Sequence, residues 1–209
     1  MIRAVISDFG GVLTTPLVRS FLAMQEESGF TVEELGRAMA KLAQADGEHP
    51  LYRLEKGEIT ESEFLSALEG AFGGDVRLER FGERYFEHLH PNEEMIALMR
   101  RLRERGLRMA LLTNNVREWE PLWRAKLPDI DEIFDVIVDS AFVGMRKPEP
   151  GIYELTLERL GEGVSATECL FVDDLEANCQ VAESLGMTAV HYREPGQAIA
   201  EIEAALSDA

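Results

Sequence analysis

Cysteine and long apolar runs are both scarce in this sequence of 209 residues. The two cysteines, Cys169 and Cys179, fall in stretches typical of a strand and a helix, and their spacing does not suit a metal site. We therefore interpret them as small buried side chains in a reducing compartment. No apolar run approaches the roughly 18 residues that a membrane span needs, and Met1 leads directly into an apolar strand instead of a signal sequence. These absences predict a cytoplasmic protein with no membrane partner.

Positive charge is also in short supply. The chain has 21 lysine and arginine residues against 39 aspartate and glutamate residues, which gives a formal net charge of −18. This charge repels nucleic acid and anionic membranes at long range, so we expect neither as a partner. An anionic substrate would need a strong local positive centre. A divalent cation with one or two basic side chains is the simplest source of that charge.

What the sequence does contain is an alternation of short β-branched runs and amphipathic stretches. The first run, within Ala4–Leu13, stops at Asp8 and a glycine pair, as a buried strand that enters a tight loop would. Four later strands are predicted at Leu107–Thr113, Val136–Val138, Leu170–Val172 and Thr188–His191. The predicted helices around them are Glu93–Arg105, Arg117–Leu127, Pro150–Leu160, Leu175–Leu185 and Gln197–Leu206. Five strands separated by helices predict an α/β fold with a doubly wound parallel sheet.

Residues 15–90 break this alternation, because their pattern is helical throughout. Two helix starts are marked by the capping-box pattern, in which a threonine is followed three residues later by a glutamate: Thr31 with Glu34, and Thr60 with Glu63. We expect a helical insertion after the first strand.

Polar side chains follow several of the predicted strands. Thr113 and Asn114 end the second strand, Lys147 precedes a proline in a loop, and Asp173 and Asp174 follow the fourth strand. Each alone also fits a structural role, as a turn, a solvated lysine or a helix cap. Two adjacent carboxylates repel each other, however, which suggests a cation. The carboxyl ends of parallel strands meet at one sheet edge, where α/β proteins bind ligands.

Together these residues resemble the haloacid dehalogenase (HAD) superfamily, whose phosphatases carry four short motifs at strand ends in this order. The stretches Asp8–Leu13, Gly144–Pro148 and Leu54–Thr60 are most similar to the amino-terminal phosphatase domain of soluble epoxide hydrolases and to bacterial sugar-1-phosphate phosphatases. The resemblance implies an α/β core formed by residues 1–14 and 91–209, with a helical cap at residues 15–90. It also implies a small phosphorylated substrate and a monomer or homodimer.

The resemblance assigns substrate chemistry to four residues. Asp8 would be the nucleophile that attacks phosphorus and becomes an aspartyl-phosphate, which suits a carboxylate because it is ionised at neutral pH. Thr113 and the backbone amide of Asn114 would hold the phosphoryl oxygens. Lys147 would offset the negative charge of nucleophile and phosphate.

The resemblance also implies a magnesium site. Asp8, Asp174 and the backbone carbonyl of Gly10 would bind the ion directly, and Asp173 would act on it through its neighbours. Magnesium fits because it prefers oxygen ligands and needs few carboxylates when a substrate phosphate completes its coordination.

Gly10 departs from the family pattern, since most of these phosphatases have there a second aspartate that transfers protons. Glycine keeps the carbonyl but loses that transfer, which is worth roughly 10² to 10⁴ in rate. We expect a bias toward leaving groups that depart without help, such as anomeric sugar phosphates or acyl phosphates. A cap residue could instead supply the proton, with His49, Glu55 and Glu58 as candidates.

Two alternatives to a phosphatase remain open from the sequence. A non-catalytic binding protein on this fold would also tolerate Gly10. A haloacid dehalogenase would use Asp8 to displace halide from carbon without a metal, and for such an enzyme the Asp173–Asp174 pair would be unnecessary.

Overall fold

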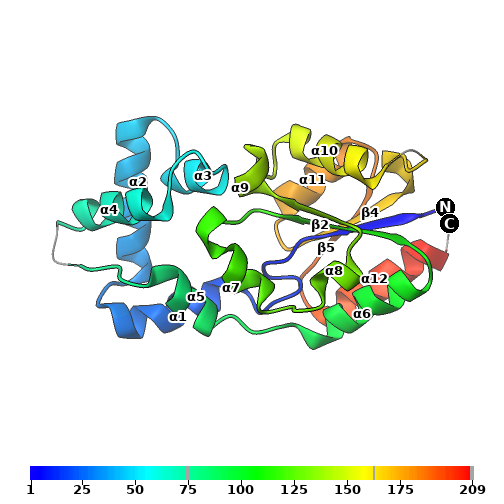
Figure 1. Ribbon diagram of the computed structural model, residues 1–209, viewed down its shortest axis with the longest axis horizontal. Helices are drawn as coiled ribbons and strands as arrows, with labels where there is room; N and C mark the ends of the chain where they lie inside the picture. Colours follow the sequence, from blue (N-terminus) through cyan, green and yellow to red (C-terminus); the bar gives the residue numbers. More distant parts are fainter. Residues whose placement is uncertain (74–75, 162, 208–209) are drawn as a thin grey trace.

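A five-stranded sheet forms the centre of the molecule (Figure 1). The computed structural model describes residues 1–73, 76–161 and 163–207, with the backbone alone for residues 24–28. The strands are β1 (Ala4–Ser7), β2 (Arg108–Thr113), β3 (Val136–Asp139), β4 (Cys169–Asp173) and β5 (Thr188–His191). All pair in parallel, in the order β3-β2-β1-β4-β5. The predicted α/β fold class is therefore confirmed.

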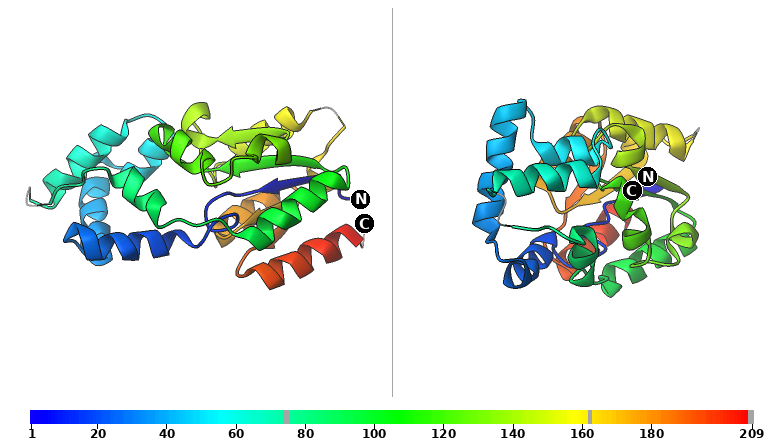
Figure 2. Two further views of the ribbon diagram at one scale, coloured as in Figure 1. Left: turned by 60° about the horizontal axis from the view of Figure 1, so that its bottom comes forward. Right: turned by 60° about the vertical axis from the view of Figure 1, so that its left-hand side comes forward.

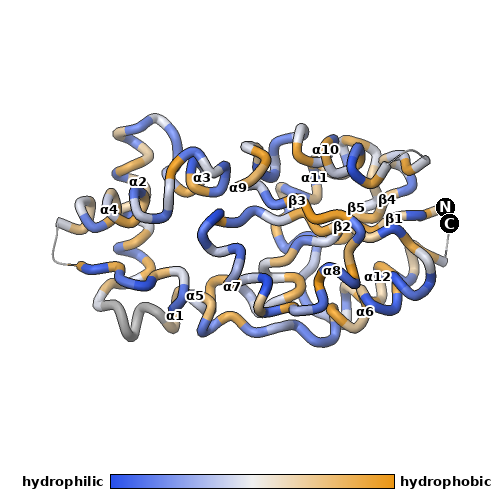
Figure 3. The backbone as a smooth tube through the Cα atoms, in the orientation of Figure 1, coloured by the Kyte–Doolittle hydropathy of each residue, from blue (hydrophilic) through white to orange (hydrophobic). Residues whose placement is uncertain are grey.

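Helices cover both faces of the sheet, which explains why its strands are apolar on both sides. Val5 and Met109 face one apolar cluster, whereas Ile6 and Ala110 face a second. The first cluster includes side chains of α6 (Glu93–Glu104), α8 (Ile130–Ile133) and α12 (Pro195–Ser207), and the second those of α10 (Pro150–Leu160) and α11 (Glu176–Ser184). The two helical layers lie on opposite sides of the sheet in Figure 1, and Figure 3 shows the apolar strands between them. This three-layer arrangement is typical of doubly wound α/β proteins.

The strand register aligns the carboxyl ends of the central strands. Ser7 at the end of β1 lies beside Leu111 of β2 and Val172 of β4. The residues that follow, Asp8 and Asp173 among them, therefore emerge at the same edge of the sheet.

The described residues between β1 and α6 form five helices. They are α1 (Leu17–Ser28), α2 (Val32–Asp46), α3 (Pro50–Glu55), α4 (Glu61–Ala71) and α5 (Phe81–Glu87). We call residues 15–90 the helical segment, and it lies beyond the carboxyl edge of the sheet (Figures 1 and 2). The chain enters and leaves it at one place, because Thr14 forms an antiparallel bridge with Pro91 and the Thr15 amide donates to the His90 carbonyl at 2.8 Å. The division into domains at these points stays a prediction.

Both predicted capping boxes are confirmed. The Thr31 hydroxyl accepts from the Glu34 amide at 3.1 Å, and the Glu34 carboxylate accepts from the Thr31 amide at 2.7 Å. Thr60 and Glu63 repeat both bonds at 3.2 and 2.8 Å. These local bonds define the starts of α2 and α4.

One predicted helix is different in the structure. Residues 117–127 form a 3₁₀ turn, η1 (Arg117–Trp119), followed by the short helix α7 (Glu120–Arg124), because Pro121 has no amide hydrogen to continue the turn before it. The short helices α8, α9 (Ser140–Val143) and η2 (Ala166–Glu168) were not predicted, since pieces of three or four residues leave no periodic pattern. Within the described ranges, no helix has both the length and the apolar character needed to cross a bilayer.

Candidate functional site

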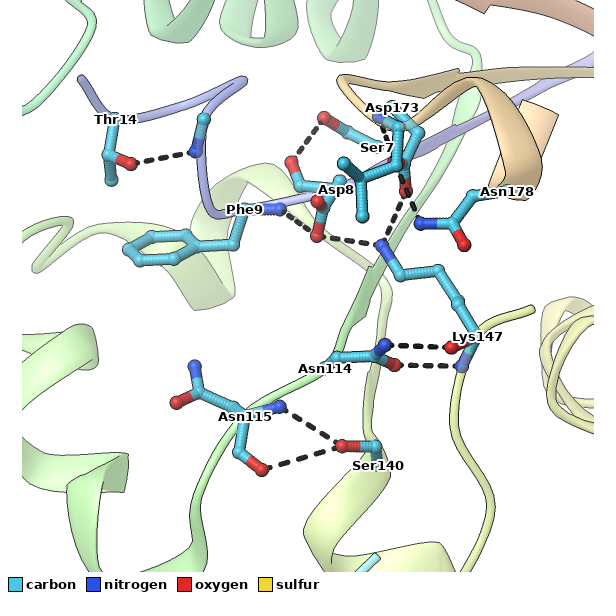
Figure 4. A network of polar contacts seen from close by, with 12 residues as sticks. Ser7, Asp8, Phe9, Thr14, Asn114, Asn115, Ser140, Lys147, Asp173 and Asn178 are labelled. Carbon is cyan, nitrogen blue, oxygen red and sulfur yellow. Dashed lines mark hydrogen bonds and ion pairs between the residues drawn. The ribbon is translucent and has the colours of Figure 1, made fainter. Parts of the chain in front are cut away.

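Asp8 lies at the start of a tight loop directly after the central strand. Its amide donates to the Val172 carbonyl of β4 at 2.9 Å, which extends the sheet pairing by one residue. Its Oδ1 accepts from the Phe9 amide at 2.7 Å. Only 8% of Asp8 is exposed, so the carboxylate is held in a defined orientation at the sheet edge (Figure 4).

Lys147 points into the same site and is 1% exposed. Its Nζ lies 2.8 Å from Asp8 Oδ1 and 2.6 Å from Asp173 Oδ2 (Figure 4). Burial alone would lower the pKa of Lys147, but the carboxylates of Asp173 and Asp8 outweigh it and raise the pKa. The side chain is therefore an ammonium that joins two carboxylates, and a role as a solvated surface lysine is excluded.

The side-chain amide of Asn114 positions Lys147. Its Nδ2 donates to the Lys147 carbonyl at 2.9 Å, and its Oδ1 accepts from the Lys147 amide at 2.8 Å (Figure 4). The resemblance had indicated only the backbone amide of Asn114 as a phosphate contact. The structure adds this second task for the side chain.

The adjacent carboxylates of Asp173 and Asp174 have different surroundings. Asp173 is fully buried and accepts hydrogen bonds from the Leu175 amide at 2.8 Å and from Asn178 Nδ2 at 2.9 Å, besides its contact with Lys147. In the described part of the chain, no other residue donates to the Asp174 carboxylate. Asp8, Asp173 and Asp174 each offer an oxygen within 4.8 Å of the others, an arrangement that could hold a metal ion.

Gly11 makes room for the Asp174 carboxylate. A Cβ at Gly11 would lie 2.3 Å from Asp174 Oδ2, and Gly11 has φ +78°, which side chains disfavour. Only glycine therefore lets the loop after β1 approach this carboxylate.

The site carries an excess of negative charge, with three carboxylates and one ammonium. Burial raises the pKa of Asp8 to about 8, although Lys147 opposes the rise and Asp173 and Asp174 add to it. Burial, together with Asp173, raises the pKa of Asp174 to about 6. A cation among these oxygens would favour their ionised forms.

Thr113 and Gly10 line a cavity next to this cluster. Thr113, the last residue of β2, is 2% exposed, and Asn114 and Phe9 line the same cavity. The φ of Gly10 lies outside the left-handed region. A Cβ there would lie 3.1 and 3.2 Å from the methyl groups of Leu17. An apolar side chain thus occupies the space next to the position where a second aspartate would stand.

The helical segment reaches the site through the end of α3. Glu55 Oε2 lies 2.7 Å from Arg146 Nε, and the Glu55 carbonyl accepts from the Ser140 hydroxyl at 2.6 Å. A Cβ at Gly57 would lie 2.3 Å from the Ala141 carbonyl oxygen. Through these contacts, the end of α3 and the residues just after it touch α9 and Arg146, the residue before Lys147.

The three proton-transfer candidates lie in different places. Glu55 lines the cavity, and burial raises its pKa although Arg146 opposes the rise. The pKa of His49 is lowered by burial and by Arg146, and its ring lies 5.0 Å from that of Tyr52. Glu58 pairs with Lys56 at 3.1 Å on the surface, outside the cavity.

Sequence reasoning missed several residues that shape the site. Asn178 and Arg146 stand close to motif residues in the sequence, so a search for their partners could have found them. Tyr85 and Trp119 had no such signal, and their rings stack at 5.4 Å in the cavity wall. Burial and the carboxylates of Asp174, Glu55 and Asp8 raise the pKa of Tyr85, which keeps its phenol protonated.

The fold and the site together define an α/β enzyme with a buried carboxylate and lysine at the carboxyl edge of a parallel sheet. The chain belongs to the haloacid dehalogenase-like hydrolase family, whose model matches residues 2–186.

Named relatives span much of the chain. Phosphatase MT3486 from Mycobacterium tuberculosis is 30% identical over 94% of this chain and 89% of that protein. Mouse acyl-CoA dehydrogenase family member 10 is 30% identical over 98% of this chain, and pig bifunctional epoxide hydrolase 2 is 29% identical over 97%. The chain spans only 19% and 38% of the lengths of these last two proteins.

Solved structures share the fold. A HAD family enzyme from Bacteroides thetaiotaomicron superposes with a TM-score of 0.70 at 26% identity, covering 92% of this chain and 94% of that one. The wild-type form of that enzyme in complex with magnesium and inorganic phosphate has the same TM-score at 24% identity, covering 92% of this chain and 95% of that one.

Proposed function

We propose that this protein is a magnesium-dependent phosphatase that cleaves a small phosphorylated metabolite through an aspartyl-phosphate on Asp8. The observation that carries the proposal is the contact of 2.8 Å between the buried Asp8 carboxylate and Lys147 Nζ, beside the two carboxylates of Asp173 and Asp174. Relatives named as phosphatases support it.

The donor set suits magnesium. The carboxylates of Asp8 and Asp174 and the Gly10 carbonyl would hold the ion, all through oxygen, the donor atom that magnesium prefers. Among the described residues, no side chain or amide of another residue donates to the Asp174 carboxylate, whereas Asp173 is engaged by Lys147, Leu175 and Asn178. We therefore assign Asp173 to the support of Lys147. When bound, magnesium would neutralise charge on the phosphoryl oxygens.

The chain's own residues perform the first step of the reaction. The Asp8 carboxylate, fixed by the Phe9 amide, attacks phosphorus as the leaving oxygen departs. The Lys147 ammonium stabilises the negative charge gathered there, because it is buried and already oriented by Asn114. Thr113 and the Asn114 amide hold the phosphoryl oxygens.

Gly10 shapes which esters react quickly. Without a carboxylate at this position, the leaving oxygen receives no proton from the loop after β1. The loss of general acid catalysis is worth roughly 10² to 10⁴ in rate, so good leaving groups are favoured.

We further propose that the helical segment is a cap that closes over the site and selects the substrate. The contacts of α3 with Arg146 and α9 support this proposal, since they place Glu55 in the cavity wall. Closure would shield the aspartyl-phosphate from stray water.

The test is rapid mixing of the full chain with acetyl phosphate, with and without magnesium, followed by mass spectrometry of the intact protein. We expect one phosphoryl group per chain, dependent on magnesium and lost in Asp8→Asn. Halide release from 2-chloropropionate without magnesium would identify a dehalogenase instead. Phosphate binding without turnover would identify a binding protein.

A further inference from the structure

The cavity beside Asp8 has a volume of about 130 Å³ and extends from the sheet edge into the helical segment. Its floor contains Gly10, Thr113 and Asn114, so it opens onto the phosphate end of the proposed site. Side chains of the helical segment and of η1 form its walls: Phe21, Met39, Phe64, Phe81, Tyr85 and Trp119. A substrate phosphate at Asp8 would therefore point its leaving group into this cavity.

The walls are almost wholly apolar. Among the described residues that line it, the polar side chains are Thr113, Asn114, Asn115, the Tyr85 phenol, the Trp119 indole and Glu55. Glu55 is the only charged one of these, and it is already paired with Arg146 at 2.7 Å. A sugar would bury several hydroxyls mainly against aromatic and aliphatic side chains, with too few polar groups to replace all of their hydrogen bonds to water, which is unfavourable. The cavity thus favours an apolar leaving group over an anomeric sugar.

The size and shape of the cavity further limit which leaving groups fit it. A cavity of roughly 150 Å³ with apolar walls is known to bind benzene, so this one matches a single ring. One wall is a set of flat faces, with Tyr85 stacked on Trp119 at 5.4 Å and Phe81 on Trp119 at 6.2 Å. Aromatic ligands pack well against such faces.

The chemistry at Gly10 points in the same direction. A phenolate is a far better leaving group than an alkoxide, because a phenol has a pKa of about 10. It can therefore depart without the proton that an aspartate at position 10 would have supplied.

We propose that the substrate is the phosphate monoester of a single-ring phenol, with its ring in this cavity. The inference rests on the proposed phosphatase function. The bond between phosphorus and the phenol oxygen breaks as the bond to Asp8 forms, and the phenolate leaves with the electron pair and takes a proton from water. Water then attacks phosphorus, which releases the Asp8 carboxylate and inorganic phosphate, and the proton of that water passes to solvent.

Phosphonates test the cavity without turnover. The measurement is the inhibition constant of each phosphonate against hydrolysis of acetyl phosphate by the full chain, with magnesium present. The three inhibitors are methylphosphonate, benzylphosphonate and 1-naphthylmethylphosphonate. Burial of one ring should make benzylphosphonate bind about 10- to 100-fold more tightly than methylphosphonate. The naphthyl compound should bind more weakly than the benzyl compound, because two rings exceed the cavity.

Two variants on α2 localise the effect. Met39 lines the cavity, whereas Leu42 packs elsewhere on the apolar core and is likewise partly buried. Met39→Gln should remove most of the preference for benzylphosphonate and leave the affinity for methylphosphonate unchanged. Leu42→Gln should keep the preference, and thermal unfolding of both variants would reveal any general loss of structure.

The outcomes separate this inference from the function on which it rests. Magnesium-dependent hydrolysis of acetyl phosphate with equal inhibition by methyl- and benzylphosphonate overturns the phenol proposal and leaves the phosphatase standing. Tighter binding of the naphthyl compound overturns the one-ring limit. Absence of both hydrolysis and phosphonate binding overturns the two proposals together.

Discussion

The side chain of Asn114 pairs with the backbone of Lys147 through two hydrogen bonds, at 2.9 and 2.8 Å, although 33 positions separate the residues. The side-chain amide thus bonds to the backbone of Lys147 as the backbone of a neighbouring β-strand would. It ties the loop that carries the only lysine of the described cluster to the end of β2. The position of the Lys147 ammonium therefore depends on a residue that the sheet itself holds.

Asn114→Ala should lower kcat about 10- to 100-fold, because each lost hydrogen bond contributes roughly 0.5–1.5 kcal/mol to the position of Lys147. KM should change little, since alanine keeps the backbone amide. The measurement is steady-state hydrolysis of acetyl phosphate with saturating magnesium. Gln197→Ala is the matched control, because Gln197 forms a similar pair with the His191 carbonyl and the Arg193 amide, both at 3.1 Å. Equal losses in both variants would argue against a positioning role.

Asp173→Ala and Asp174→Ala should fail in different ways. Loss of Asp173 leaves the buried Lys147 with Asp8 as its remaining carboxylate and Asn178 Nδ2 without its acceptor, so the variant should be destabilised by about 3–5 kcal/mol. Loss of Asp174 removes a repelling charge, so its thermal stability should hold while activity requires far more magnesium. Thermal unfolding and magnesium titration of both proteins give the comparison. A greater magnesium demand in the Asp173 variant would reverse the assignment.

Activity of the wild-type protein should depend steeply on the leaving group, with aryl and acyl phosphates fast and alkyl phosphates slow. Gly10→Asp should speed alkyl phosphates by about 10² or more and flatten this dependence. The backbone of Gly10 permits a side chain, but its Cβ would crowd Leu17 at 3.1 Å. The substitution is therefore made alone and together with Leu17→Ala.

Leu17→Ala alone is the control for this pair, and rates with ethyl and phenyl phosphate are the measurement. Similar wild-type rates with both esters would show that another group supplies the proton. Glu55, which lines the cavity, would then be tested first through Glu55→Gln.

Asp139 should make the protein less stable as the pH rises. Burial raises its pKa from 3.8 to about 7, and Glu120 adds to the rise. Between these two pH values, Asp139 is protonated in the folded state and ionised in the unfolded state. The free energy of unfolding therefore falls from about pH 4 to about pH 7 and is constant above pH 7. Asp139→Asn should remove about 2–3 kcal/mol of the difference in unfolding free energy between pH 5 and pH 8. Urea unfolding of both proteins at the two pH values is the measurement. An equal change in unfolding free energy in the wild type and the variant would contradict this prediction.

The sequence predicted the sheet and the residues at its edge because both depend on local patterns. A β-branched run predicts a strand, and in a parallel sheet the next residue must emerge at the carboxyl edge, as Asp8 and Asp173 do. The contact between Glu55 and Arg146 joins positions 91 residues apart and has no local signature. The cavity wall at Tyr85 and Trp119 likewise depends on how helices pack, which periodicity alone does not determine.

The central position of β1 has a consequence for synthesis of the chain. Ala4 pairs with Arg108 on one side and with Cys169 on the other, so the strand made first gains its second neighbour late. At about 5–20 residues per second, the ribosome needs roughly 3 to 12 seconds to make the intervening stretch. During that interval one edge of an apolar strand lacks its partner, which favours association with other chains. The loop that carries Asp8 can reach its final form only after β4 has been made.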